Sequence, residues 1–204
     1  KAAIEGLSEI TNKISAIKTR IEEILRTINE LNKISLGKQE ELSKTQENIT
    51  ELIRDKKNHV QIISDLKTSH KREMSALNIE KDKLSRENTT IKAENATALA
   101  DGKINLDTKQ RIENLAKSND EKIAQLQKEK TEAFNEYTIN LENAKKELQQ
   151  TKADLESHQK IKNETTSDCK VLQMEIIEAT QTINDIIASF DNMPSMDKMQ
   201  LNKL

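Results

Sequence analysis

The stretch ATALADGKINLDTKQR, residues 96–111, decides whether this chain folds back on itself. It lies near the midpoint of 204 residues and contains Gly102, one of only three glycines. Glycine readily adopts the left-handed conformation that commonly ends a helix. Asp107 or Thr108 can then cap a following helix. The stretch therefore predicts a turn at about Asp101–Leu106, and the alternative is one helix that runs straight through.

The composition favours long helices over a globular domain. Charged residues make up 33% of the chain, hydrophobic residues 34% and aromatic residues 1%, with a single proline. A globular core of this length usually needs aromatic side chains, whereas abundant Glu, Lys, Leu, Ile and Gln with little Gly or Pro is typical of a coiled coil. The net charge is −2 and the two signs alternate along the chain, so we expect no basic patch for nucleic acid.

Isoleucine and leucine recur at alternating intervals of three and four residues from the start of the chain. This spacing is the a/d pattern of a coiled coil, whose apolar stripe is buried only against other helices. The residues of this stripe, here and in the second half of the chain, are called the seam. Its first members are Leu7, Ile10, Ile14, Ile17, Ile21, Ile24, Ile28, Leu31, Leu52, Ile63 and Leu66.

The heptad phase of the seam shifts twice. In the middle of the chain, glutamates occupy the positions where the first phase expects apolar residues. A four-residue insertion in the heptad pattern, called a stutter, near His70 restores an apolar phase that includes Leu84 and Ile123. A second stutter near Lys130 is expected to start the last phase at Phe134. The further seam members in this phase are Leu141, Leu155, Ile176, Ile183, Ile186 and Phe190.

The positions of the stutters indicate that the two halves pair antiparallel. In such a pair the numbers of facing residues have a constant total, and a total of 207 aligns Ile21 with Ile186. The same total aligns Leu84 with Ile123 and places the fold point beside Gly102. We therefore predict an all-α fold, a long coiled coil in the form of an antiparallel helical hairpin. One uninterrupted helix in a coiled-coil oligomer is the alternative, because an antiparallel dimer of such helices obeys the same rule.

The expected boundaries follow from these features. The first coiled-coil arm spans residues 1–100, the turn 101–106 and the second arm 107–193. Pro194 lacks the amide donor that a helix needs and disfavours helix in the residue before it. Residues 194–204 are therefore expected to form a short terminal segment.

Several polar residues fall in the seam. Asn88 and Asn119 also total 207, so they either face each other and pin the alignment or both face solvent in a weak region. His59 and His70 share a helix face, but two histidines make a poor metal site because zinc sites need three or four ligands. Cys169 is expected to act as a small apolar side chain in the seam.

The sequence contains no motif that indicates an enzyme. It has no glycine-rich phosphate loop and no nucleophile with an associated base, and its carboxylates are spread along solvated faces. Catalysis also needs a concave, water-excluding pocket, which a rod lacks. We expect no catalytic, cofactor-binding or metal site and no small-molecule substrate. We also expect no membrane span, because no apolar run approaches roughly 18 residues.

The apolar face is wider than the seam, which predicts self-association. Isoleucine at both a and d favours trimers or tetramers over dimers in parallel coils. A two-helix hairpin would leave the apolar residues beside the seam exposed to solvent. We therefore expect a homo-oligomer, or docking on other proteins of a larger assembly. These flanking residues are Leu25, Ile53 and Val60 at e positions and Ile34 and Ile62 at g positions.

The chain resembles a generic coiled-coil rod, as found in cytoskeletal, tethering, motor-stalk and virion scaffold proteins, and the heptads alone carry this resemblance. It implies a structural spacer, tether or scaffold in the cytoplasm or within an intracellular or virion assembly. The alternative is a secreted or membrane-active helical-bundle protein, such as a toxin or adhesin stalk. A membrane-active protein needs an apolar hairpin tip, and the only apolar residues of the predicted tip are Ile104 and Leu106. A secreted protein is expected to carry glycans. Four asparagines fit the glycan-acceptor pattern, Asn48, Asn88, Asn95 and Asn163, about as many as chance supplies.

Overall fold

The protein consists of two long helices joined by a tight turn. The computed structural model describes residues 2–103 and 105–192. Helix α1 spans Ala2–Ala100 and helix α2 spans Leu106–Asp191, and the described residues contain no strand. The prediction of an all-α hairpin is confirmed. The alternative of one uninterrupted helix is wrong, because the first helix ends before the turn.

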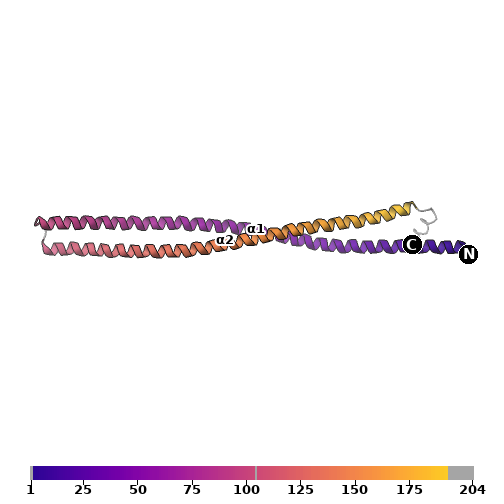
Figure 1. Ribbon diagram of the computed structural model, residues 1–204, viewed down its shortest axis with the longest axis horizontal. Helices are drawn as coiled ribbons and strands as arrows, with labels where there is room; N and C mark the ends of the chain where they lie inside the picture. Colours follow the sequence, from indigo (N-terminus) through magenta and orange to yellow (C-terminus); the bar gives the residue numbers. More distant parts are fainter. Residues whose placement is uncertain (1, 104, 193–204) are drawn as a thin grey trace. The chain divides into compact units, whose positions relative to one another are not determined.

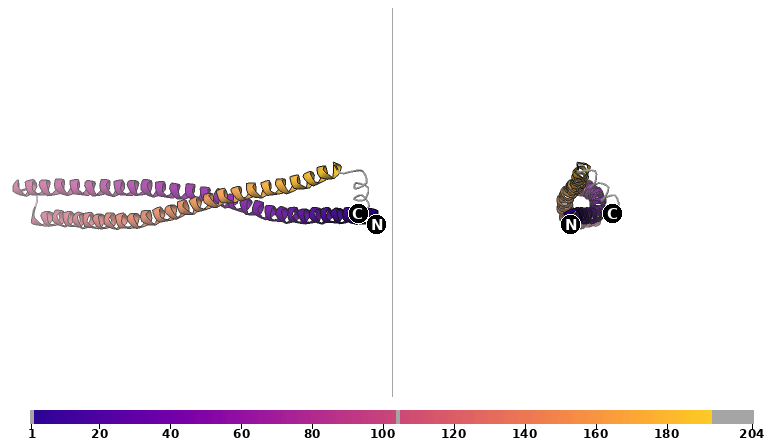
Figure 2. Two further views of the ribbon diagram at one scale, coloured as in Figure 1. Left: turned by 45° about the vertical axis from the view of Figure 1, so that its right-hand side comes forward. Right: turned by 90° about the vertical axis from the view of Figure 1, so that its right-hand side faces the viewer.

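The chain divides into two compact units. The turn unit, Leu52–Asp154, contains the second half of α1, the turn and the first half of α2. The terminal unit combines Lys1–Glu51 with Leu155–Leu204, of which residues 2–51 and 155–192 are described. Within the turn unit the two helices lie side by side and run in opposite directions, as Figures 1 and 2 show at the end that carries the turn.

Gly102 ends α1 in the left-handed conformation, with a φ of 68°. Its amide donates to the carbonyl of Leu99 at 3.1 Å, and the amide of Lys103 donates to the carbonyl of Ala98 at 2.9 Å. These two hydrogen bonds form a Schellman motif, which satisfies carbonyl groups that the end of a helix otherwise leaves unpaired. The sequence-based expectation for this glycine agrees with the structure.

Asn105 caps α2, because its Oδ1 accepts a hydrogen bond from the amide of Thr108 at 2.9 Å. The prediction that Asp107 or Thr108 is the cap is therefore wrong, and the helix begins at Leu106, within the predicted turn. Asp107 lies in the first helical turn instead. Its negative charge is favourable there because the amino-terminal end of a helix carries a partial positive charge.

The far end of α2 lies close to its predicted boundary. The helix ends at Asp191, whereas the second arm was expected to extend to residue 193. Ile104 and the predicted terminal segment 194–204 lie outside the described residues. Neither helix, over the residues described, has an apolar stretch that could cross a membrane.

The seam residues differ in how deeply they are buried. Most are only half-buried, because a single partner helix covers one side of each stripe. The exception is Leu7, which is 47% exposed. Ile14 and Leu155 are buried, and the half-buried members are Ile10, Ile17, Ile21, Ile24, Ile28, Leu31, Leu52, Ile63, Leu66, Leu84, Ile123, Leu141, Ile176, Ile183, Ile186 and Phe190.

Candidate functional site: the contact between the helices

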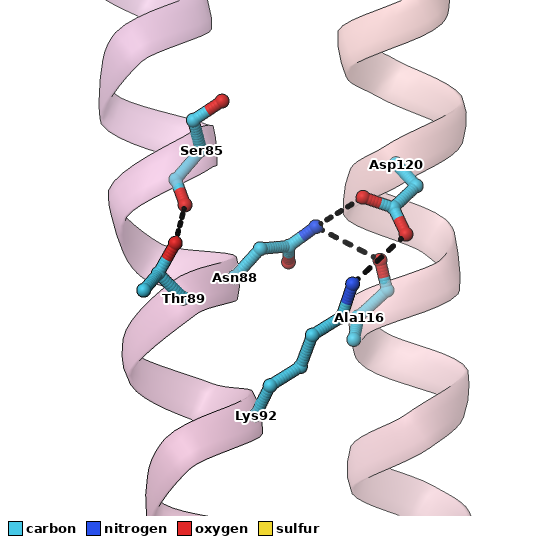
Figure 3. Close-up of polar contacts among 6 residues, drawn as sticks. All are labelled: Ser85, Asn88, Thr89, Lys92, Ala116 and Asp120. Atoms are coloured by element: carbon cyan, nitrogen blue, oxygen red, sulfur yellow. Dashed lines mark hydrogen bonds and ion pairs between the residues drawn. The ribbon is translucent and has the colours of Figure 1, made fainter.

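A buried asparagine joins the two helices of the turn unit (Figure 3). Nδ2 of Asn88 on α1 donates to the carbonyl oxygen of Ala116 at 3.1 Å and to Oδ1 of Asp120 at 2.7 Å, both on α2. Nζ of Lys92 lies 3.5 Å from the second carboxylate oxygen of Asp120. Hydrogen bonds to a charged acceptor are stronger than neutral ones, so this amide–carboxylate bond is the strongest part of the contact.

This contact shows which residues Asn88 bonds to at the level where it was predicted to face Asn119. Both residues are 4% exposed, so the alternative in which they face solvent is wrong. No hydrogen bond joins them within the described ranges, and the Asn88 amide bonds to residues before and after Asn119 instead. Ala116, which is buried, has no side chain beyond Cβ, and this lets the amide of Asn88 reach the backbone of the facing helix.

The Asn88 contact disfavours other alignments of the helices. Oδ1 of Asn88 and Oδ1 of Asn95 are buried without a hydrogen-bond partner among the described atoms. A shift along the helix axis would separate Nδ2 of Asn88 from its two acceptors and leave this donor unpaired as well. Each buried group left unpaired costs about 1–3 kcal/mol. The contact therefore adds specificity where an apolar pair would add more stability.

Sequence reasoning missed the acceptors in this region. Asp120 is one, and Gln127 is another, because its Oε1 accepts from Nζ of Lys81 across the helices at 2.7 Å. Both are polar residues beside the seam, a kind that occurs throughout the chain, so the pattern alone does not distinguish them.

An aromatic stack lies at the predicted first stutter. The ring of His70 on α1 and the ring of Tyr137 on α2 are 3.7 Å apart between centroids, with 5° between their planes. Phe134 is a tilted second neighbour of His70, at 6.1 Å. The numbers of His70 and Tyr137 total 207, so this pair agrees with the predicted alignment within the turn unit.

The second stutter lies at a different residue from the one predicted. Buried positions step by four residues twice around His70 on α1 and twice around Tyr137 on α2, so the two phase shifts meet at one level. The predicted seam position Phe134 is 54% exposed, and Ala133 is half-buried in its place. Hydrophobicity favoured the phenylalanine, but the packing against α1 selects the alanine.

The candidate metal and thiol residues are spread along the helices. Nδ1 of His59 lies 3.7 Å from Oε2 of Glu147, a pair that is ionic only when the histidine is protonated. Cys169 is a half-buried free thiol in the terminal unit. In the part of the chain that the structure describes, no group of three or more His, Cys, Asp or Glu residues could hold a metal ion.

A polar zone of the terminal unit contains a cross-helix ion pair. Nζ of Lys38 lies 3.3 Å from Oε2 of Glu41 and 3.7 Å from Oδ2 of Asp168. The hydrogen bond and charge of Glu41, followed by the charge of Asp168, raise the pKa of Lys38. The Lys38–Asp168 contact joins α1 and α2 within the terminal unit.

The surface depressions are lined by mixed side chains. One, of about 660 Å³, is lined by α1 alone, and another, of about 430 Å³, lies beside the His70 ring. The first is lined by Ile79, Asp82, Lys83, Arg86, Glu87, Thr90 and Ile91, and the second by His70, Met74, Gln127, Lys130, Thr131 and Phe134.

The apolar residues that flank the seam remain exposed to solvent. Their side chains are 46–51% exposed, as expected for a hairpin whose edges no further helix covers. These residues are Leu25 and Ile34 in the terminal unit and Ile53, Val60 and Ile62 in the turn unit.

No protein-family model matches this chain, and neither a curated protein nor a solved structure is significantly similar to it.

Proposed function

We propose that this protein is a non-enzymatic structural coiled coil that self-associates and acts as a spacer, tether or scaffold within a larger assembly. The supporting observation is the pair of exposed apolar edges beside the seam, which includes Leu25, Ile34 and Val60. Large exposed apolar patches mark interaction surfaces. Covering these edges with further helices would gain about 25 cal/mol for each Å² of apolar surface removed from water.

The long helices support a role based on length. A helix of 99 residues, such as α1, advances about 150 Å at 1.5 Å per residue. The hydrogen bonds of Asn88 favour one antiparallel alignment over others, as a spacer of defined length requires. The seam carries the assembly in this proposal, and the surface charges select the partners.

A glycan-bearing secreted role receives less support from the helix contact. Asn88 and Asn95, two of the four asparagines in acceptor patterns, are buried between the helices. Glycosylation needs an exposed asparagine, so these two sites are closed to it in the folded hairpin.

The test is the mass of the chain in solution, measured by multi-angle light scattering. We expect wild type to exceed the 23.2 kDa of one chain, and Leu25→Lys combined with Ile34→Lys to lower the mass toward that value with unchanged helical circular dichroism. The matched control is Asn29→Lys, an exposed residue outside the seam, which should keep the wild-type mass. A monomeric wild type at high concentration would contradict self-association.

A further inference from the structure

Helix α2 carries an apolar stripe on the face that points away from α1. Val171, Met174 and Ile177 in the terminal unit are 52%, 62% and 60% exposed, and their spacing of three residues places them along one side of the helix. The half-buried seam residues of the same segment include Leu172 and Ile176. At 100° per residue, Met174 lies about 180° from the centre of these seam positions, so the hairpin contact does not use the stripe.

Two opposite charges bracket the stripe symmetrically. Lys170 lies four residues before Met174 and Glu178 lies four residues after it, and both side chains are exposed. Neither takes part in the ion pairs formed among residues 2–103 and 105–192. When two copies of the stripe are aligned antiparallel about Met174, Lys170 of each copy therefore lies opposite Glu178 of the other.

We infer that a second copy of this chain docks antiparallel on this stripe, with Met174 at the two-fold axis. The inference rests on the proposed self-association and adds a second contact surface to it. Val171 of each copy packs against Ile177 of the other, and Lys170 of each copy pairs with Glu178 of the other. A two-fold interface uses the same patch on both subunits, as this arrangement does. Parallel docking would place like charges together and is disfavoured.

The charges beside the stripe favour a second copy over a membrane surface. A helix that lies on an anionic membrane carries Lys and Arg on its polar face. Here Glu175 and Glu178 flank the stripe and would be repelled by anionic lipids. Three apolar side chains make a small patch, so the contact on its own is expected to be weak and to act together with the edges beside the seam.

Charge exchange tests the orientation. Lys170→Glu or Glu178→Lys alone places like charges opposite each other twice per dimer, so each should weaken the association by at least about tenfold. The two changes in one chain restore opposite charges and should return the association to within about twofold of wild type. Sedimentation equilibrium measures this. Single variants that associate like wild type, or a double variant that stays weak, would overturn the inference.

Cross-linking tests the axis in a Cys169→Ala background. A short bis-maleimide should link Met174→Cys to its own copy, because position 174 faces itself. Val171→Cys alone should not link, whereas a mixture of Val171→Cys with Ile177→Cys should. Efficient linking of Val171→Cys to itself would indicate parallel docking and overturn the inference.

The two proposals fail in different ways. A monomeric wild type would overturn both the self-association and its surface. An oligomeric wild type without Met174→Cys linking would overturn only the surface proposed here. Binding of wild type to phosphatidylserine-containing vesicles that is lost in Met174→Glu would assign the stripe to lipid and also overturn the inference.

Discussion

The two units differ in their most buried side chains. In the terminal unit the most buried residue is Ile14, in a run of isoleucines that continues to Ile28. In the turn unit the contact near the turn buries Asn88, Asn119 and Ala116. Apolar contact is strong but has no direction, whereas a hydrogen bond is weaker and tolerates little displacement. We infer that the terminal unit supplies stability and the turn unit supplies the alignment.

The largest effect is expected in the isoleucine run. Ile21→Asn combined with Ile24→Asn removes two half-buried apolar side chains and places amides there without partners, so the free energy of unfolding should fall by about 3–5 kcal/mol. Urea unfolding followed by circular dichroism measures this. The control Ile4→Asn, at an exposed position, should change little. An unchanged midpoint and mass for the double variant would show that the run does not hold the helices together.

The next effect is expected at the hydrogen-bonded contact. Asn88→Asp removes the amide donor and places a carboxylate beside Asp120, so we expect a loss of about 2–3 kcal/mol. Thr89→Asp, at the exposed neighbouring position, is the control. A loss of equal size in both variants would show that the hydrogen bonds of Asn88 do not account for the loss of stability.

A smaller and opposite effect is expected from an apolar residue at the same position. Asn88→Leu should raise the free energy of unfolding by about 1 kcal/mol but loosen the alignment. Paired cysteines measure the alignment: Leu84→Cys with Ile123→Cys reports the pairing predicted at a total of 207, and Leu84→Cys with Lys130→Cys reports a shift of one heptad. The shifted link should form only in the Asn88→Leu chain. Its appearance in wild type as well would show that Asn88 does not set the alignment.

The smallest effects concern two glycines with opposite expectations. Gly37 lies within α1, with no atom within 4 Å of an added Cβ, so Gly37→Ala should stabilise by about 0.5–1 kcal/mol. Gly102 has a φ of 68°, so Gly102→Ala should destabilise by about 1 kcal/mol. Thermal unfolding of the two variants checks the contrast. A shift in the same direction for both would contradict it.

The sequence by itself determined the features that depend on local backbone rules and on periodicity. Sparse glycine and proline determined the two long helices, and the freedom of Gly102 determined where the first one ends. The three-and-four spacing identified the buried faces, and a constant total of residue numbers identified the antiparallel alignment that His70 and Tyr137 follow in the turn unit. Each of these follows from the order of residues along one helix.

Only the tertiary structure decided which side chains meet across the two helices. It selected Ala133 over Phe134 in the seam, paired the Asn88 amide with Ala116 and Asp120, and left Leu7 exposed. A shift of a fraction of a helical turn changes all of these without changing the hydrophobic period. Periodicity identifies the face that is buried, whereas the rotation and axial offset of the facing helix determine each side chain's partner.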